Sequence, residues 1–222
     1  MNMEDEKIID SWNKNAEEWI RVIGTGQIDS RKFTNKAIEN EVKAVSGNTV
    51  VDIGCGEGWL TRAISAMGKT AVGIDAIEKL LENARTKGSE KFYQFGYQDI
   101  IDGKSIPEAP FDVAVFNFCL YQKDGLDKLL SSTKNQLNGE GVILIQTLHP
   151  FFLFINGLSY KSQIISNSWK GLPGNFIEGH EWYARTFEDW VQTISESGLQ
   201  ITGFKEVLNE KDNPISLILK LK

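Results

Sequence analysis

The hydrophobic and polar positions of residues 49–148 fall into two kinds of segment. Short apolar runs rich in β-branched residues, such as TVVDI at 49–53 and FDVAVFNF at 111–118, predict buried strands. Between such runs lie segments with apolar residues at helical spacing, such as 57–67 and 76–88. Strands that alternate with helices form right-handed βαβ units, so the pattern predicts a parallel sheet with helices on both faces.

The two ends of the chain follow different patterns. Apolar residues at helical spacing over 4–22 predict an amphipathic helix, and with a second helix at 31–46 they make an N-terminal helical cap of residues 1–46. Apolar runs at 199–208 and 215–222 follow each other with no helix between them, which predicts an antiparallel hairpin. The expected fold is therefore α/β, a doubly wound Rossmann-like sheet that is mostly parallel and ends in this hairpin.

The alternation stops between His149 and Arg185. Segment 149–185 is rich in aromatic residues and glycine and has little periodicity. Long irregular segments inside a compact domain are usually lids or binding loops. We therefore expect one domain over residues 1–222, with 149–185 as an insert that lines an apolar or aromatic ligand pocket. Aromatic-rich loops also form dimer interfaces, so a homodimer is the alternative use of this insert.

Composition and charge narrow the choice of partners. The 222 residues include 30 acidic and 24 basic side chains, with a net charge of −6 and no basic block of five or more, which argues against a nucleic-acid partner. Two cysteines without a C-x-x-C pattern or zinc spacing indicate a reducing compartment and no metal site. The N-terminus is charged where a signal peptide is apolar, and the longest apolar run, PFFLFI, is too short to span a bilayer. We expect a cytoplasmic protein without a membrane partner.

Three glycines follow the strand at 49–53 at alternate positions, Gly54, Gly56 and Gly58. Glycine permits positive φ angles and lets a ligand approach the main chain, and the helix beginning near Glu57 directs backbone N–H groups at that place. In a doubly wound sheet the ligand lies beyond the carboxyl ends of the strands, which is where this loop is expected. A turn that serves packing alone is the less favoured interpretation.

The spacing of the glycines selects among nucleotide ligands. The dinucleotide fingerprint is G-x-G-x-x-G, whereas this loop reads G-x-G-x-G and carries Trp59 at the position of the third fingerprint glycine. The carboxylate of Asp52 immediately before the loop would repel a pyrophosphate. It suits a ligand that has positive charge and no phosphate, and S-adenosylmethionine, with its ammonium and sulfonium groups, is such a ligand.

At these residues the chain resembles a known family. VVDIGCGEGWL resembles motif I of the class I S-adenosylmethionine-dependent methyltransferases, and the resemblance extends over most of the chain through AVGIDA, YQDI, FDVAVFNFCLYQ and GEGVILIQTLHP. More narrowly, GCGEGWL, IQTLHP and WYARTFEDWV resemble the small-molecule branch often called type 11. The resemblance implies a seven-stranded sheet, S-adenosylmethionine as cofactor and methyl transfer to a small-molecule acceptor.

The resemblance also implies a set of cofactor-binding residues. Those implied for the methionine moiety are Asp52, which orients the ammonium, and Gly54, Cys55, Gly56 and Glu57, which contact it through the backbone. Those implied for the rest of the cofactor are Asp75 and Ala76 at the ribose, Asp99 and Ile100 at the adenine, and Asn117 and Phe118 beside the sulfonium.

The two histidines are the candidates for a catalytic base. A hydroxyl or amine that accepts a methyl group must lose a proton, and histidine titrates in the right range. His149 directly follows the fifth strand and His180 lies late in the insert, so both are predicted near the mouth of the pocket. The alternatives are a strand-end histidine bonded to backbone and an exposed loop histidine, and methyl transfer by proximity alone needs neither. Arg185 is expected either to hold a substrate carboxylate or to pair with an acid such as Glu181.

The expected function is therefore methyl transfer from S-adenosylmethionine to a small molecule. At the end of the fourth strand the chain reads NFCL, where DNA amino-methyltransferases carry Asp/Asn-Pro-Pro-aromatic, so methylation of bases is not expected. Two alternatives remain open. One is a non-catalytic cofactor-binding or interaction protein that has lost its acceptor site, and the other is an NAD-dependent oxidoreductase, which the loop spacing and Asp52 disfavour.

Overall fold

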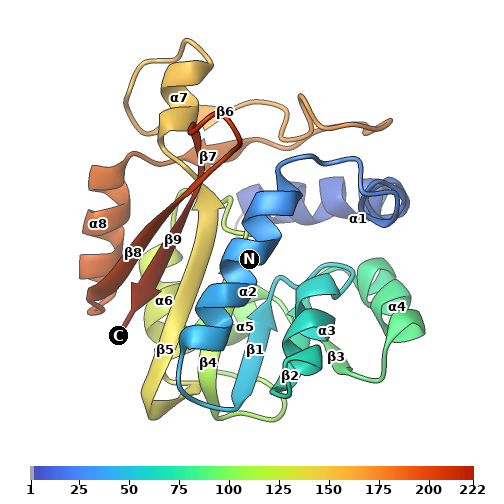
Figure 1. The fold of residues 1–222 in the computed structure, drawn as a ribbon, viewed down its shortest axis with the longest axis vertical. Helices are drawn as coiled ribbons and strands as arrows, with labels where there is room; N and C mark the ends of the chain where they lie inside the picture. Colours follow the sequence, from blue (N-terminus) through green and yellow to red (C-terminus); the bar gives the residue numbers. More distant parts are fainter. Residues whose placement is uncertain (1–2) are drawn as a thin grey trace.

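The computed structural model describes residues 3–222, and its centre is a seven-stranded sheet in the order β3-β2-β1-β4-β5-β9-β8. The strands β1 (Thr49–Ile53), β2 (Thr70–Asp75), β3 (Lys91–Gln94), β4 (Phe111–Asn117) and β5 (Leu137–Leu148) are parallel. β9 (Pro214–Leu221) runs antiparallel to both β5 and β8 (Ile201–Leu208). This is the predicted doubly wound sheet with its C-terminal hairpin (Figure 1).

Helices cover both faces of the sheet. The helices α2 (Arg31–Ala44) and α3 (Trp59–Ala66) pack on one face, and α4 (Glu78–Lys87) covers Phe92 of β3. On the other face the core includes residues of α5 (Tyr97–Ile101), α6 (Leu126–Lys134) and α8 (Phe187–Glu196). Successive residues of β1 supply the two cores in turn, because side chains alternate along a strand: Val50 joins the first core, and Val51 and Ile53 join the second.

Several boundaries differ from the prediction for local reasons. The helix expected from Glu57 begins at Trp59, because Gly58 before it has a φ of 78° and cannot belong to the helix. The run KFYQFGY at 91–97 reads as one strand in the sequence, but β3 ends at Gln94. The chain then forms the short helix α5.

The remaining elements lie beyond the carboxyl ends of the parallel strands. These are α1 (Met3–Gly24), α7 (Phe151–Ile155) and the antiparallel pair β6 (Gln163–Ile165) and β7 (Trp182–Ala184), all seen above the sheet in Figure 1. Segment 149–185 therefore contains one short helix and two short strands, although the sequence predicts irregular structure there. None of the helices in residues 3–222 is long and apolar enough to cross a bilayer.

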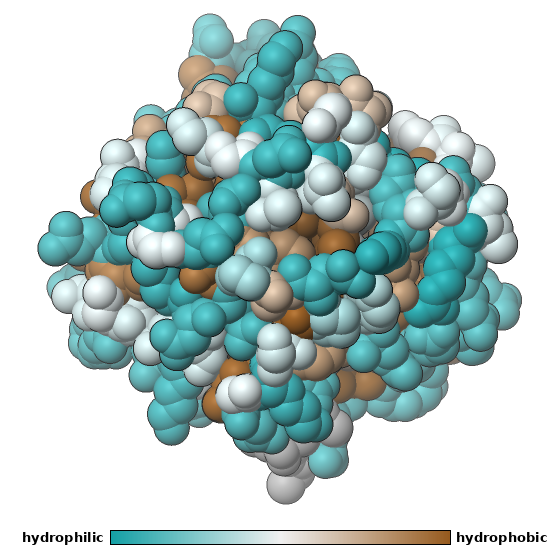
Figure 2. Space-filling model, turned by 90° about the horizontal axis from the view of Figure 1, so that it is seen from below, coloured by the Kyte–Doolittle hydropathy of each residue, from teal (hydrophilic) through white to brown (hydrophobic). Residues whose placement is uncertain are grey.

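The end of the molecule opposite these elements has a mainly hydrophilic surface. Figure 2 views the protein from below, and hydrophilic residues cover most of that face, with hydrophobic residues visible in smaller areas between them, most clearly near the centre. The large cavity of the protein lies at the other end of the sheet.

Candidate functional site

A cavity of about 1610 Å³ lies above the carboxyl ends of the strands. It begins at the loop after β1 and extends under α1 to the segment between β5 and α8. β1 and β4 meet at the point where the strand order reverses, which is where doubly wound sheets bind ligands. Since pockets for one small molecule usually measure about 300–1,000 Å³, this cavity has room for two ligands side by side.

The cavity brings together most of the residues predicted for the site. Those that line it are Asp52, Gly54, Cys55, Gly56, Glu57, Asp75, Ala76, Asp99, Asn117, Phe118, His149 and His180. Ile100 does not line it. Its fully buried side chain belongs to the hydrophobic core beneath α5, so the predicted adenine contact of this side chain has no support in the geometry.

The three loop glycines all have positive φ, but they differ in what surrounds them. A Cβ atom added at Gly54 would lie 2.7 Å from the Cβ of Cys119, and one added at Gly58 would lie 2.6 Å from the ring of Phe92. At Gly56 the nearest neighbouring atom would be 3.8 Å away. Packing therefore requires Gly54 and Gly58, whereas Gly56, with a φ of 58°, borders open space where a ligand can approach the backbone.

The loop is fastened to β2 by its own amides. The N–H groups of Gly54 and Cys55 both donate to the carbonyl of Ile74, at 2.8 and 3.0 Å. The next amide, of Gly56, donates to the carboxylate of Asp75 at 2.8 Å. The first three amides of the loop therefore bind β2, and the N–H groups that the sequence expects to face a ligand are those at the start of the helix that follows.

Asp75 connects the loop to the chain beyond β2. Its second carboxylate oxygen accepts from the N–H of Ile77 at 2.8 Å, and burial raises the pKa of the carboxyl. Each carboxylate oxygen has two lone pairs, so two acceptor sites remain for hydroxyl groups of a ligand. The neighbouring Ala76 lines the cavity, and its carbonyl accepts from the side-chain amide of Gln94 at 3.1 Å.

Asp52 is a buried carboxyl beside the loop. It is 1% exposed, its carboxylate accepts from the hydroxyl of Thr61 at 2.7 Å, and it lines the cavity. Burial raises the pKa of Asp52 to about 7, with a smaller contribution from the charge of Asp75. A cationic group placed in the cavity would favour the ionised form, because opposite charge offsets the cost of burial.

Replacing Asp52 with asparagine is expected to change how stability depends on pH. The folded protein holds the Asp52 proton up to a pKa of about 7, whereas the unfolded chain releases it near 3.8. The native state thus binds more protons in this range, so the free energy of unfolding falls as pH rises from about 4 to 7. An asparagine side chain has no proton to release, and Asp52→Asn should gain on the order of 4 kcal/mol relative to wild type between pH 4 and pH 8. Urea unfolding of both proteins at several pH values measures this, and parallel pH curves would contradict it.

The side chains of Glu57 and Cys55 are poorly suited to act on a ligand. The Glu57 carboxylate, 1% exposed, pairs with Arg62 at 2.8 Å and Lys87 at 3.5 Å. Burial raises the pKa of the Cys55 thiol well above its usual value, so it is not a thiolate nucleophile. The backbone contacts that the sequence implies stay a prediction, since the N–H and the carbonyl of Cys55 already bond to Ile74 and Gly58.

Asp99 lies in the first turn of helix α5. Its carboxylate accepts from the N–H of Gly96 at 2.9 Å and pairs with Lys104 at 2.5 Å, and these partners lower its pKa. Asp99 does line the cavity, but its oxygens hold the helix start, so a contact with an adenine amine must share them. Gln98 lines the cavity beside it; it belongs to the YQDI motif, but no role was predicted for it from the sequence.

The end of β4 carries two unusual features. The side-chain oxygen of Asn117 is buried and has no hydrogen-bond partner in the described part of the chain. Phe118 has a φ of 51°, which is strained for a bulky residue, and its N–H and carbonyl are held by the Gln146 carbonyl and the Tyr121 hydroxyl. Strain and unpaired polar atoms occur preferentially at functional sites, which supports a ligand at this end of β4.

His149 is 4% exposed, and both of its ring nitrogens have partners. Nε2 lies 2.8 Å from a carboxylate oxygen of Glu206, and Nδ1 accepts from the N–H of Phe151 at 3.0 Å. The ring is therefore fixed with no lone pair available to a substrate. This geometry argues against the predicted base role and agrees with the alternative of a strand-end histidine.

His180 has a different environment. It is 5% exposed, so it is not the exposed loop residue of the alternative interpretation. Its Nδ1 lies 2.9 Å from the hydroxyl oxygen of Ser168, and its Nε2 is buried without a partner among the described residues. Burial lowers the pKa of His180 to about 4, so the imidazole is neutral at ordinary pH. His180 thus combines a place at the cavity with a free ring nitrogen.

Arg185 has a structural role in this arrangement. It is 5% exposed, and its guanidinium donates to the carbonyls of Gln122 and Lys123 at 2.9 and 2.6 Å. The acid nearest to it is Asp189, at 3.3 Å, rather than Glu181 as expected. Arg185 therefore fastens the chain after β4 to α8 and does not present a free cation to a substrate. Within residues 3–222, no group of three His, Cys, Asp or Glu side chains is arranged to hold a metal ion.

The sheet order, the glycine loop and the acid that ends β2 define a class of protein, the doubly wound proteins that bind a nucleoside-containing ligand at the switch point. Residues 30–201 match the model of the methyltransferase domain family, so the chain belongs to that family. The predicted family, S-adenosylmethionine as cofactor and methyl transfer to a small molecule are confirmed by this match together with the relatives below.

Relatives in sequence and structure carry the same activity in their names. The chain is 28% identical over 191 residues to the ubiquinone biosynthesis O-methyltransferase of Idiomarina loihiensis, covering 83% of this chain and 79% of the relative. The structure of the Burkholderia thailandensis 1,6-didemethyltoxoflavin-N1-methyltransferase, with its substrate and S-adenosylhomocysteine bound, aligns with a TM-score of 0.70 at 14% identity, covering 100% of this chain and 90% of that one. A Clostridium acetobutylicum S-adenosylmethionine-dependent methyltransferase aligns with a TM-score of 0.66 at 16% identity, covering 95% and 98%.

Proposed function

We propose that S-adenosylmethionine occupies the loop end of the cavity and that an aromatic methyl acceptor occupies the other end. The buried, unpaired oxygen of Asn117 and the open space at Gly56 support the fit of the cofactor. In this arrangement Asp75 accepts hydrogen bonds from the ribose hydroxyls, Asp52 faces the ammonium, and Phe118 borders the sulfonium.

Several features of the cavity support an aromatic acceptor. The end away from the loop is lined mainly by rings and neutral polar groups, which include Trp12, Tyr121, Trp169, Trp182, Gln122, Asn156 and Gln163. The buried cation there, Arg185, is already paired with carbonyls. Aromatic walls favour a planar ring, and neutral polar groups orient its substituents. The names of an O-methyltransferase relative and an N1-methyltransferase neighbour support a hydroxyl oxygen or a ring nitrogen as the attacked atom.

In the proposed mechanism the cofactor supplies a methyl group already activated by its positively charged sulfur. The chain's own contribution is to hold the acceptor in line with that methyl group and to exclude water, which supplies much of the acceleration in such reactions. The free Nε2 of His180 would take up the proton that the acceptor's oxygen or nitrogen loses. Because His180 is neutral above its pKa of about 4, that nitrogen is available without prior loss of a proton.

The experiment that tests this function uses S-adenosylmethionine labelled in its methyl group. The label is offered to phenols with neighbouring hydroxyls, to heterocycles with a ring N–H and, as controls, to aliphatic alcohols and amines. We expect label in an aromatic hydroxyl or a ring nitrogen. Label in the aliphatic compounds alone, or in none of the panel, would overturn the proposal.

His180→Ala is expected to lower kcat on the accepted compound by about 100-fold, because a positioned base contributes about 10²–10⁴-fold. His180→Gln, which keeps a polar side chain but no basic nitrogen, should lose as much. For the wild type we expect no acid limb near pH 6.5, because His180 is protonated only near pH 4. Rates for His180→Ala close to wild type would mean that methyl transfer proceeds by proximity alone.

The organisation of the chain forms part of the same proposal. We take residues 1–222 as one methyltransferase domain, with 1–46 as a cap that includes α1 and α2 and 149–185 as the insert on the methyl-acceptor side. The cavity supports this division, since α1 and the insert both line it. Both cysteines are free thiols, which supports a cytoplasmic location. A homodimer stays a prediction of the sequence.

A further inference from the structure

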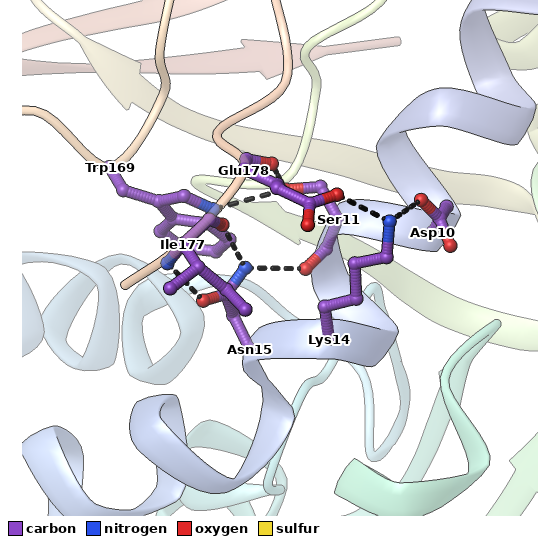
Figure 3. Close-up of polar contacts among 7 residues, drawn as sticks. All are labelled: Asp10, Ser11, Lys14, Asn15, Trp169, Ile177 and Glu178. Atoms are coloured by element: carbon purple, nitrogen blue, oxygen red, sulfur yellow. Dashed lines mark hydrogen bonds and ion pairs between the residues drawn. The ribbon is translucent and has the colours of Figure 1, made fainter. Parts of the chain in front are cut away.

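Helix α1 is joined by hydrogen bonds to a segment more than 150 residues away in the sequence. Asn15 is 1% exposed, and its side chain pairs with the backbone of Ile177 as a neighbouring strand would. The amide nitrogen donates to the Ile177 carbonyl at 2.7 Å, and the amide oxygen accepts from the Ile177 N–H at 2.8 Å. The same nitrogen donates to the carbonyl of Ser11 at 2.8 Å. Every polar atom of this side chain is therefore used (Figure 3).

Ser11 extends the connection by one helical turn. Its hydroxyl, in a residue 2% exposed, donates to the carbonyl of Glu178 at 2.8 Å and accepts from the indole N–H of Trp169 at 3.0 Å. Outside it, Lys14 forms an ion pair with Glu178, but exposed pairs add little stability. We call Ser11, Asn15, Trp169, Ile177 and Glu178 the α1 clasp; Figure 3 shows their side chains and backbone groups meeting between α1 and the insert.

The clasp lies against His180. The ring of Trp169 is 5.7 Å from the imidazole between centroids, and Trp12 on α1 is 4.6 Å from Trp169 and 6.5 Å from His180. From the end of β4, the ring of Tyr121 lies 5.3 Å from the imidazole. Backbone and side chain of Ser168 both bond to His180. The burial of His180 therefore depends on α1, on segment 167–180 and on the end of β4 together.

Helix α1 has a second attachment that does not involve the clasp. Its apolar face packs on Ile77 and Leu80 through Ile9, Ala16 and Ile20. Loss of the clasp leaves α1 with its packing on α4, while segment 167–180 keeps the hydrogen bond from the Asn175 N–H to the Glu18 carboxylate and the ring contacts with Trp12 and Trp19. Removing the Asn15 amide leaves the N–H and carbonyl of Ile177 without partners, at a cost of about 1–3 kcal/mol for each buried group, so the segment is expected to be held less closely to α1.

We propose that Ser11 and Asn15 are positioning residues of the methyl-acceptor site: through the clasp they hold segment 167–180 on α1, and the His180 wall of the cavity is complete only while the clasp is closed. The inference rests on the proposed function in that it takes the His180 end of the cavity as the acceptor end. Ser11 and Asn15 do not line the cavity themselves. They act by fixing His180, Trp169 and Trp12 around the acceptor.

The test is NMR spectroscopy of the histidine rings, which needs neither cofactor nor acceptor. The chain has two histidines, so His149, tied to Glu206, serves as an internal reference. In the wild type the His180 signal should not move between pH 5 and 8, because the ring is neutral above about 4. In Asn15→Ala we expect the signal to titrate with a midpoint shifted toward the ordinary value of about 6.5. The titratable side chain packed on the ring is Tyr121, which stays neutral in this range because burial raises its pKa.

Asn13→Ala is the matched control, since Asn13 is exposed on the same helix two residues away, and it should leave the His180 signal unchanged. Ser11→Ala, which removes the Trp169 and Glu178 contacts and keeps Asn15, should shift the midpoint in the same direction. It also serves as the test if Asn15→Ala does not fold. A His180 signal that stays fixed in a folded clasp variant would overturn the inference.

A different measurement tests the proposed function separately from the clasp. A titration with S-adenosylhomocysteine on the same samples shows whether the cofactor site exists. Absent binding together with a shifted His180 midpoint would contradict the proposed function and leave the clasp intact as a structural device. Normal binding with an unmoved midpoint would contradict the clasp alone.

Discussion

Asp75→Asn is expected to weaken the binding of S-adenosylhomocysteine by about 100-fold. The carboxylate accepts from the amides of Gly56 and Ile77, and in the proposed complex it also accepts from ribose hydroxyls. Asparagine has one acceptor oxygen, so its NH₂ group faces one of these N–H donors. Hydrogen bonds to a charged group contribute about 1.5–3 kcal/mol each, and the loss of one or two corresponds to roughly 10²-fold in the dissociation constant. Calorimetric titration measures the change.

The matched control for Asp75 is Asp212→Asn. Asp212 is exposed in the turn between β8 and β9, with a φ of 57° that asparagine tolerates. The Asp212→Asn variant should bind S-adenosylhomocysteine as tightly as the wild type does. If Asp75→Asn is folded and binds as tightly as this control, Asp75 does not contact the cofactor.

Gly58→Ala is expected to lower the free energy of unfolding by about 3 kcal/mol, which combines about 1–2 kcal/mol for the left-handed conformation with about 1–3 kcal/mol for overpacking. Gly58 has a φ of 78°, and an added Cβ would lie 2.6 Å from the Phe92 ring and 3.0 Å from the Cβ of Ala84. Both neighbours belong to the buried core under α4, so little room exists for them to move. Urea unfolding gives the difference from wild type.

Gly68→Ala separates the two contributions to the loss at Gly58. Gly68 has a φ of 86°, and an added Cβ there would meet nothing within 4 Å. This variant should lose only the conformational part, about 1–2 kcal/mol. If both variants lose the same free energy of unfolding, the contact with Phe92 does not contribute to the loss at Gly58.

The parts of the site that lie on regular elements could be predicted from the sequence. β1 ends at Ile53 and β2 ends at Asp75, as their apolar runs indicate, and both places follow from the parallel order of the strands. The acid at Asp75 is bonded to the glycine loop, which the motif spacing implies but does not show. Local periodicity was sufficient here because each feature directly follows a strand.

Other parts depended on contacts that local patterns do not contain. Asp99 was expected to face the adenine, but it lies in the first turn of a five-residue helix and pairs with Lys104, and Ile100 turns into the core. The apolar character of the preceding residues favoured a continued strand and concealed this turn. His149 lies where the sequence predicts, but its ring nitrogen is not free to act as a base. That nitrogen pairs with Glu206, which belongs to the distant strand β8.

The α1 clasp could not be predicted from the sequence for the same reason. Asn15 and Ile177 meet across 162 residues, and neither belongs to a motif. The apolar residues of α1 predict a cap and nothing more. The structure adds that the buried polar residues of this helix form hydrogen bonds with the insert.

Two alternatives to the enzymatic account predict different results. An NAD-dependent oxidoreductase would need a pyrophosphate beside Asp52, a buried carboxyl that has no cation partner among the described residues. A non-catalytic binding protein would keep Asp75 but need not keep a free histidine nitrogen at the far end of the cavity. The family match and the arrangement of His180 both favour the methyltransferase.

The most direct test of the account is calorimetric titration of the purified protein with S-adenosylmethionine, S-adenosylhomocysteine and NADH in parallel. The account predicts saturable binding of the first two, at one site per chain, and no binding of NADH. Binding of NADH, or no binding of either S-adenosyl compound by protein shown to be folded, would contradict the assignment of the glycine loop and the function built on it.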